Sequence, residues 1–383
     1  MDTVGVIIPM RKDGCDWNEL NMTETKVVEM LSLGGGVDST CLLAMDLCPE
    51  AAAAHLGITV EKLREIIPGY EWVVFSDPGS EWPQTYENLD YAETICNKVG
   101  KNFQRVYFMQ GFYRHKETNE RIYVEQWRKL SDEEKGNYAH SRERFTIFEW
   151  LTKTGVLPTL PGYKHTCSEK FKGEPQRKWA NAQFEQGTIK RWSLGIEANE
   201  STRHKRFTMN KSKAMDDARM GHEYRYPLIE LGMTRKDCQE MLRVLEWDYK
   251  GDGSDVEKSS CMWCPYLKGW EVDRLIQADG IGLKEALAIE KKFVEIDKHK
   301  RWHDAGMPLN ASGTCQGLKG PDGLGYHRQP YVTGTCDHAA CAENNKKNLG
   351  KAQLIQLKFP DKEGKSRRWS IQEYLDNGGV PKN

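Results

Sequence analysis

The stretch Lys26–Leu47, KVVEMLSLGGGVDSTCLLAMDL, decides the fold predicted for this chain. Its first part, Val27–Leu33, is an apolar run that is short enough to be a buried parallel strand. The glycine triplet Gly34–Gly36 follows, and because glycine has no Cβ, the chain can turn sharply there and bring its N–H groups close to an anion. Asp38–Leu47 then predicts an amphipathic helix packed on the sheet. Strand, glycine turn and helix start together indicate a phosphate-binding loop.

The order of residues in this turn indicates which kind of phosphate-binding loop it could be. A plain tight turn would also use three glycines, and neither GxxxxGK[ST] nor GxGxxG is present. The turn resembles the SGGxDS loop of the PP-loop ATP pyrophosphatases, with a glycine in place of the first serine. The resemblance implies that ATP phosphates are bound by Gly34, Gly35, Gly36, Asp38, Ser39 and Thr40.

Bulk composition excludes several classes of protein. The 383 residues carry 55 Lys plus Arg against 56 Asp plus Glu, so no overall field attracts a polyanion. No apolar run is long enough for a membrane helix, and we expect a soluble, cytoplasmic protein with no membrane partner. The 11 cysteines are odd in number and scattered, which favours thiols and metal ligands over a disulfide framework.

Three segments are expected along the chain. Residues 1–25 read as a lead-in, 26–246 as the nucleotide-binding catalytic domain, and 247–383 as a cysteine-containing helical region with a basic tail. The predicted fold class is α/β, with a doubly wound, mainly parallel sheet. The resemblance implies the adenine nucleotide alpha-hydrolase-like version of that fold.

A second apolar strand, Trp72–Ser76, ends at the polar stretch DPGSEWPQT. Ligands of open α/β sheets bind at the carboxyl ends of the strands, so Asp77 and Glu81 are candidates for holding Mg²⁺ or a ribose. A capped polar turn would explain the same residues. The segment resembles F-x-D-T-G-x-E-x-P-x-T-Y of the phosphoadenosine phosphosulfate reductase branch of the superfamily, which adds Gly79 to the nucleotide site.

The next segments supply framework. A helix is predicted from Gln84 to about Val99 and a third strand over Phe103–Phe108. The charged, aromatic-rich region from Gly111 to Lys153 is predicted to form helices beside the sheet, with a lid over the nucleotide as the alternative.

Cys167 precedes a basic helix start, where cations and the helix dipole favour the thiolate, although a buried structural cysteine is the simpler interpretation. Its surroundings, C-S-E-K-F-K-x-E-P, resemble a C-T-x-x-F/L-K-x-x-P element of the same branch. The resemblance implies that Cys167 is catalytic and that Lys172 contacts an anion.

A fourth strand is predicted over Lys190–Ile196, and a cationic cluster follows it. This exit resembles G-I-x-A-x-E-S-x-R-R, and by that resemblance Arg203 and Arg206 face the phosphate or sulfate end of the substrate. A solvated basic loop is the alternative. Tyr226–Leu245 resembles the element that closes the catalytic domain, and Thr234 is predicted to cap its helix.

The pair Cys261 and Cys264 is the second organising feature, because two thiolates at C-x-x-C spacing can share one metal or cluster. By resemblance to the sulfur-transferring and DNA-phosphorothioation branches, Cys167 joins them in a [4Fe–4S] cluster. Zn²⁺ with a fourth ligand from Cys315, Cys336 or Cys341, and a redox-active pair, are the alternatives.

The function implied by the whole resemblance is an ATP- and Mg²⁺-dependent sulfurtransferase. It would adenylate a nucleic acid (DNA or tRNA) or nucleotide substrate, release pyrophosphate, and receive sulfur from a donor protein such as a cysteine desulfurase; a homodimer is compatible with this. Asp38 and Ser39 would serve in catalysis. A phosphosulfate reductase is the first alternative, although its E-C-G-x-H motif is absent. A nucleotide-sensing or nucleic-acid-binding protein of a phage or defence system is the second.

Overall fold

A computed structural model gives the fold. It describes residues 26–154, 166–200, 203–205, 211–247, 261–262, 264, 274–275, 281–296, 358–360, 366–368 and 375–376. The predicted lead-in, Arg206, and the alternative fourth ligands Cys315, Cys336 and Cys341 lie outside the described residues.

The centre of the fold is a five-stranded sheet in which all paired strands are parallel. The strand order is β3-β2-β1-β7-β8, so the chain builds outward from β1 on one side and then returns to its other side. The expectation of a mainly parallel α/β sheet is confirmed. The strands are β1 (Val27–Ser32), β2 (Trp72–Asp77), β3 (Asn102–Tyr107), β7 (Ile189–Leu194) and β8 (His222–Arg225).

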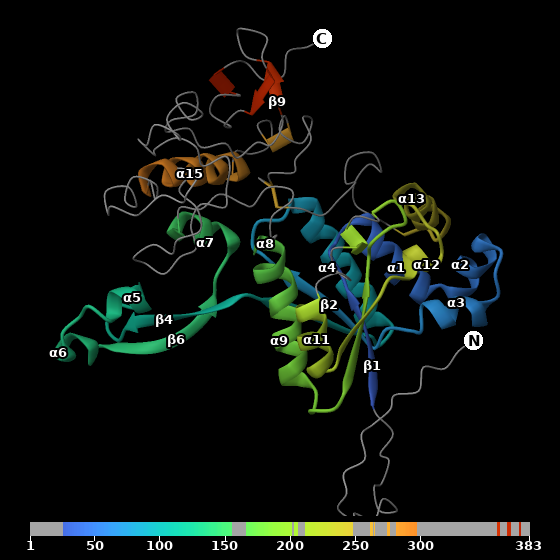
Figure 1. The fold of residues 1–383 in the computed structure, drawn as a ribbon, viewed down its shortest axis with the longest axis horizontal. Helices are drawn as coiled ribbons and strands as arrows, with labels where there is room; N and C mark the ends of the chain where they lie inside the picture. Colours follow the sequence, from blue (N-terminus) through green and yellow to red (C-terminus); the bar gives the residue numbers. More distant parts are fainter. Residues whose placement is uncertain are drawn as a thin grey trace, which may run out of the picture.

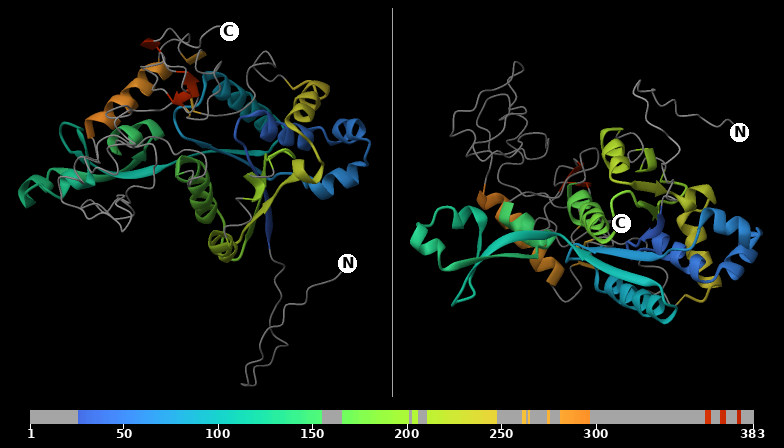
Figure 2. Two further views of the ribbon diagram at one scale, coloured as in Figure 1. Left: turned by 45° about the horizontal axis from the view of Figure 1, so that its top comes forward. Right: turned by 90° about the horizontal axis from the view of Figure 1, so that it is seen from below.

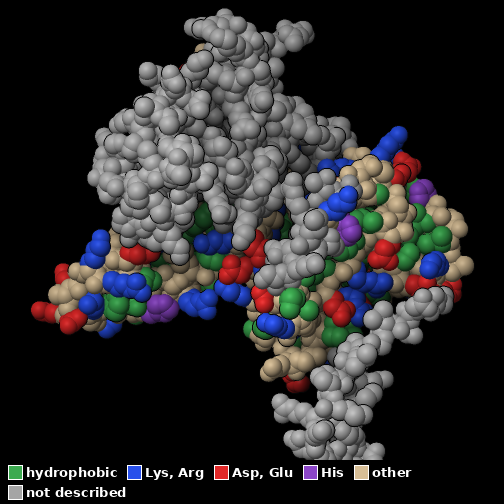
Figure 3. All heavy atoms as spheres, in the orientation of Figure 1, with side chains coloured by type: hydrophobic (Ala, Val, Ile, Leu, Met, Phe, Trp, Pro, Cys, Tyr) green, Lys and Arg blue, Asp and Glu red, His purple; other side chains and the backbone are tan. Residues whose placement is uncertain are grey.

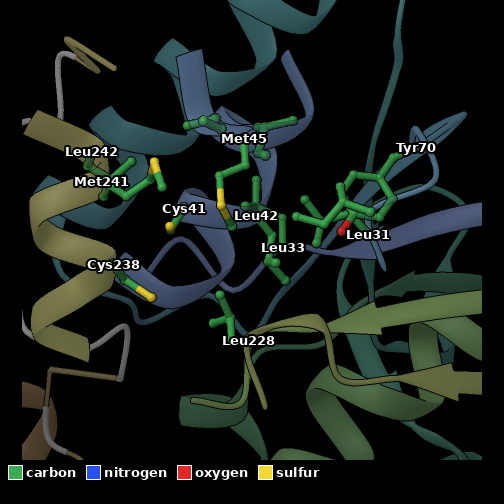
Figure 4. Packing of buried hydrophobic residues seen from close by; sticks show 14 of the residues in the cluster. Leu31, Leu33, Cys41, Leu42, Met45, Tyr70, Leu228, Cys238, Met241 and Leu242 are labelled. Carbon is green, nitrogen blue, oxygen red and sulfur yellow. The ribbon is translucent and has the colours of Figure 1, made fainter. Parts of the chain in front are cut away.

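Helices cover both faces of this sheet because side chains alternate along each strand. Leu31 and Val73 point into a core formed with α1, α4 and α13, while Met30 and Val74 point into a second core against α9. Figure 4 shows the first core, where Cys41 of α1 and Cys238 of α13 lie next to each other. These helices and their neighbours are α1 (Val37–Leu47), α2 (Pro49–Leu56), α3 (Val60–Ile66), α4 (Pro83–Lys98), α9 (Glu174–Gln183), α11 (Lys211–Arg219), α12 (Pro227–Glu230) and α13 (Arg235–Val244).

An antiparallel arm replaces the helices predicted between residues 111 and 153. It projects away from the parallel sheet, as Figures 1 and 2 show, and the prediction of helices was wrong for most of this region. Pairing between distant segments forms the arm, and its charged sequence buries few side chains, among them Phe112 and Ile122, so helical and strand periods are hard to tell apart. Its elements are β4 (Met109–His115), β5 (Arg121–Tyr123), α5 (Val124–Trp127), α6 (Asp132–Lys135) and β6 (Tyr138–Arg144).

A third apolar cluster joins segments from far apart in the chain. Trp82 and Phe171 pack in it together with Leu275 and with Ile289 of α15 (Ile281–Ile296). Helix α15 also lies against α7 (Ile147–Thr154), which follows the arm (Figure 1). The described part of the tail includes a two-stranded antiparallel sheet, β9 (Lys358–Pro360) with β10 (Ser366–Arg368). None of the helices in the described ranges is long and apolar enough to cross a membrane.

His222 gives the fold a pH-dependent component of stability. The ring is 3% exposed, its Nδ1 accepts a hydrogen bond from Trp192 Nε1 at 3.0 Å, and its Nε2 lies 3.0 Å from Asn181 Oδ1. Burial, followed by the charges of Lys190 and Arg177, lowers its pKa to about 4 from the ordinary 6.5. The unfolded chain therefore takes up a proton first as the pH falls, and the contribution that is complete above pH 6.5 is lost on the way to pH 4.

We expect this linkage to cost about 3 kcal/mol of unfolding free energy between neutral pH and pH 4. Urea unfolding of the native protein and of His222→Gln at several pH values measures it. The variant should show a shallower fall in stability across this range, and equal slopes in the two proteins would contradict the assignment.

Candidate functional site

The glycine loop lies at the carboxyl end of β1, where the order of strands reverses between β1 and β7. Such switch points are where open α/β sheets bind ligands. Gly195, just after β7, approaches the loop so closely that a Cβ there would lie 2.6 Å from the backbone nitrogen of Ser39. The exit of β7 therefore forms one wall of the loop.

Two glycines in the loop have separate structural roles. Gly35 has a φ of +73°, and a Cβ on it would come within 2.8 Å of Thr85 Cγ2. Gly36 is the N-cap of α1 in an extended conformation and offers no side-chain cap. Because the first N–H groups of a helix have no acceptor inside the helix, this uncapped end suits an anion.

Ser39 and Thr40 hold the loop in shape. The Ser39 hydroxyl accepts a hydrogen bond from Gly34 N–H at 3.0 Å and donates to Gly36 O at 3.3 Å. The Thr40 N–H donates to the same carbonyl, and the Thr40 side chain is buried. The hydroxyl of Ser39 thus forms part of the loop's own hydrogen bonding.

Asp38 is anchored by a residue that the sequence did not single out. Arg235, the first residue of α13, donates from Nη2 to Asp38 Oδ2 at 2.7 Å and from Nε to Oδ1 at 3.3 Å. Burial raises the pKa of Asp38, Arg235 opposes that shift, and the nearby carboxylates Glu200 and Glu197 reinforce it. Glu197 and Glu200 follow β7 and Arg235 begins α13, so the exit of β7 and the start of α13 both lie close to the loop. Thr234 caps α13 in a capping box with Asp237, as predicted.

Asp77 organises the turn after β2. Its Oδ1 accepts hydrogen bonds from Gly79 N–H at 2.7 Å and from the Tyr86 hydroxyl at 2.8 Å. Its Oδ2 accepts from Arg144 of the arm at 2.7 Å. Gly79 has a φ of +88°, and a Cβ there would collide with Thr146 at 2.5 Å. Asp77 therefore joins the root of the arm to the edge of the sheet where the loop lies.

Glu81 and Lys172 form a charged pair beside the cysteines. Glu81 is 1% exposed, Lys172 Nζ lies 2.7 Å from its Oε1, and its Oε2 has no hydrogen-bond partner among the described residues. The pKa of Lys172 is raised by Glu81, Cys261 and Cys264 against the opposing effect of burial. Lys172, predicted as an anion contact, thus faces a carboxylate and two thiols.

The three predicted cysteines lie near one another. Cys261 forms an isolated antiparallel bridge with Glu81, and Cys264 N–H donates to Cys261 O at 3.0 Å. Cys167, in the short helix α8 (Thr166–Ser168), packs against the same third apolar cluster as the other two. Burial raises the pKa of Cys261 well above the ordinary value; Glu81, Cys264 and Cys167 raise it further, and Lys172 lowers it. None of the seven cysteines in the described part of the chain forms a disulfide.

The donor atoms of these thiols bear on the metal that they would suit. No three His, Cys, Asp or Glu side chains within the described ranges converge as the ligands of one metal ion do. Thiolates are ligands both of zinc and of iron–sulfur clusters, so the donor set by itself fits either group.

Arg203, predicted to face the phosphate or sulfate end of the substrate, lies on the surface. Arg203 is half exposed and pairs with Glu200, its Nη1 lying 2.9 Å from Oε2. Arg235 and Gly195 were missed, although each lies within an element quoted for the resemblance. A glycine immediately after a parallel strand was the available signal for Gly195, because close backbone approaches require glycine.

Comparison of this chain with protein-family models found no match, and comparison with curated proteins found none either.

Proposed function

We propose that this protein is a PP-loop ATP pyrophosphatase that adenylates a nucleic acid or nucleotide substrate and replaces the activated oxygen with sulfur. The observation that carries the proposal is the shared edge of the sheet. The glycine loop follows β1, and the turn bridged to Cys261 follows the neighbouring strand β2. A nucleotide and a thiol centre would then meet over adjacent strand ends. The resemblance adds the adenine nucleotide alpha-hydrolase-like fold to this proposal.

The glycine loop would contribute to the reaction by electrostatic stabilisation. A substrate oxygen attacks the α-phosphorus of ATP, and the bond to the β-phosphate oxygen breaks with its electron pair leaving on pyrophosphate. The N–H groups at the start of α1 have no side-chain cap and would bind the phosphates, and preorganised donors of this kind stabilise charge that develops in the transition state. Ser39 keeps those groups in position through its bonds to Gly34 and Gly36.

Carboxylates around the loop support a requirement for Mg²⁺. Asp38 is influenced by the charges of Glu197 and Glu200, whereas Arg235 is the cation bound to it directly. The negatively charged phosphates of bound ATP would need a counter-charge in this setting. Mg²⁺ usually binds through one or two carboxylates together with substrate phosphates and waters, so a preformed three-ligand site is not required.

The sulfur step would follow at the cysteines. A sulfur nucleophile attacks the adenylated centre, the bond from that centre to its oxygen breaks, and AMP leaves with the oxygen. Cys167, Cys261 and Cys264 would hold a [4Fe–4S] cluster, whose fourth iron supplies a position for a sulfide when no fourth cysteine binds it. Lys172 lies beside them and would balance the charge of bound thiolates, while its ion pair with Glu81 at 2.7 Å holds it in place.

Two measurements on anaerobically purified protein test this proposal. We expect pyrophosphate release from ATP that increases with tRNA or single-stranded DNA, and iron in a ratio near four per chain. Cys261→Ser should lose most of the iron, because it removes one of the three ligands. Cys48→Ser is the matched control, since Cys48 is exposed and lies between α1 and α2, and it should keep the iron.

The outcomes separate the alternatives. Zinc in place of iron would contradict the cluster. Binding of ATP without pyrophosphate release under any substrate would contradict the enzyme and favour a nucleotide sensor.

A further inference from the structure

The arm has two chemically different faces. In the antiparallel pairing of β4 with β6, Tyr113 lies opposite His140 and Gly111 opposite Arg142, and side chains alternate between the faces. The face that carries these residues is here called the basic-aromatic face. Its strand residues are Met109, Gly111, Tyr113 and His115 of β4 with Tyr138, His140, Arg142 and Arg144 of β6.

Charge is segregated between the two faces. None of the β4 and β6 residues on the basic-aromatic face is acidic. Glu143, the acidic residue of β6, lies on the opposite face, where Arg114 pairs with it beside the buried Phe112. Arg142 is exposed and makes no ion pair with any residue in the described ranges. Figure 3 shows basic side chains and a histidine along the arm and acidic ones at its tip.

The aromatic rings on this face pack against one another. Tyr113 stacks on Trp127 of α5 with ring centroids 4.1 Å apart and an interplanar angle of 3°. His140 packs edge-on against Tyr113, and Gly111 leaves the room for it, since a Cβ there would lie 2.9 Å from His140 Nε2. Tyr113 and Trp127 are half-buried and His140 is exposed, and a sheet face that carries aromatic rings is how several modules bind unpaired bases.

The face continues into a cavity at the root of the arm. The cavity has a volume of about 290 Å³ and lies between the edge strand β3 and α9, with Arg142, Lys178 and Trp179 among its lining residues. Next to it, the Arg144 guanidinium lies 4.5 Å above the Tyr107 ring and also pairs with Asp77. Cations and rings thus extend from the arm to the turn after β2.

We propose that the basic-aromatic face and this cavity bind a single strand of nucleic acid and lead it to the carboxyl edge of the sheet. Cations would neutralise phosphates while the rings stack on bases, and a duplex hides the base faces that such rings need. This proposal rests on the proposed function only in that the strand would be the substrate to be adenylated.

Binding of the full-length protein to labelled 20-nucleotide single-stranded DNA and RNA, without ATP, tests the proposal by fluorescence anisotropy. Arg142→Glu should weaken binding about tenfold and make its dependence on salt less steep, because one phosphate contact is lost. Tyr113→Ala should weaken binding by roughly five- to tenfold at unchanged salt dependence, because it removes stacking. The control Arg219→Glu, an exposed residue of α11, should bind normally.

Three outcomes would overturn the proposal. The first is tighter binding of duplex than of single strands, and the second is an equal loss of binding affinity in Arg142→Glu and in the control Arg219→Glu. The third is that an acidic protein competes for the face and nucleic acid cannot displace it. The same measurements distinguish this proposal from the proposed function. Strand binding with no pyrophosphate release would support the role of the arm and contradict the enzyme. ATP turnover together with normal strand binding by Arg142→Glu would support the enzyme and contradict the role of the arm.

Discussion

A Gly195→Ala variant is expected to lose about 100-fold in ATP-dependent pyrophosphate release while keeping its fold. The added methyl group would lie 2.6 Å from the Ser39 nitrogen and 2.9 Å from its Cα, and both atoms belong to the backbone of the loop. Relief of this clash requires the β7 exit and the glycine loop to separate by about an ångström. A displacement of that size in a positioned site typically costs about two orders of magnitude in rate.

The matched control for this prediction is Gly57→Ala. Gly57 has a φ of +66° and open space around its missing side chain, so alanine there strains the backbone by about 1 kcal/mol without moving the loop. Thermal unfolding of both variants separates stability from activity. If Gly57→Ala lost activity to the same extent as Gly195→Ala, general destabilisation would be the cause and the loop contact would not matter.

The second large effect is expected at the ion pair between α1 and α13. The Asp38 side chain is 10% exposed and that of Arg235 is 29% exposed, so Arg235→Ala leaves a carboxylate largely out of water. Removing one partner of a buried pair typically costs 3–5 kcal/mol, and the partial exposure of Arg235 places our expectation at about 3 kcal/mol. Urea unfolding at neutral pH measures this cost.

A double-mutant cycle identifies the pair as the cause. Asp38→Asn combined with Arg235→Ala should cost about 2 kcal/mol less than the two single changes summed, because no unpaired charge remains. Relative to the native protein at the same pH, the variant Arg235→Ala should also lose less stability as the pH falls. Its folded state takes up a proton on Asp38 before the unfolded chain does, since burial already raises the pKa of Asp38 above 3.8. Additive costs, or a cost of Arg235→Ala relative to the native protein that is the same at low and at neutral pH, would contradict the assignment.

An exposed pair serves as the reference for this cycle. Arg219 and Asp216 are 73% and 69% exposed, and Arg219→Ala should change the unfolding free energy by about 0.5 kcal/mol or less.

The parallel sheet was largely predictable because most of its strands coincide with short apolar runs in the sequence. Val27–Leu33, Trp72–Ser76, Phe103–Phe108 and Lys190–Ile196 were predicted as strands, and each overlaps a strand of the parallel sheet. Strand β8 was missed, since HEYR carries no apolar run and pairs only along β7 at the edge of the sheet. The arm was missed for a similar reason, because its strands pair across more than 20 residues of polar sequence.

The site could be predicted only as far as local motifs reach. The glycine loop and its strand–turn–helix setting follow from one short stretch of sequence. The pairing of Asp38 with Arg235 spans 197 residues, and no spacing rule connects two positions that only the folded helices bring together. The link between Glu81 and Cys261 is of the same kind, since a single bridge between backbone segments leaves no pattern in the chain.

The third apolar cluster bears on where this protein can be divided. Trp82 and Phe171 come from the predicted catalytic segment, whereas Leu275 and Ile289 come from beyond residue 247. A protein truncated after α13 would expose the indole of Trp82 and the phenyl ring of Phe171 to solvent. Such a form would tend to aggregate. Shortened forms meant for crystallisation should therefore keep the chain through α15.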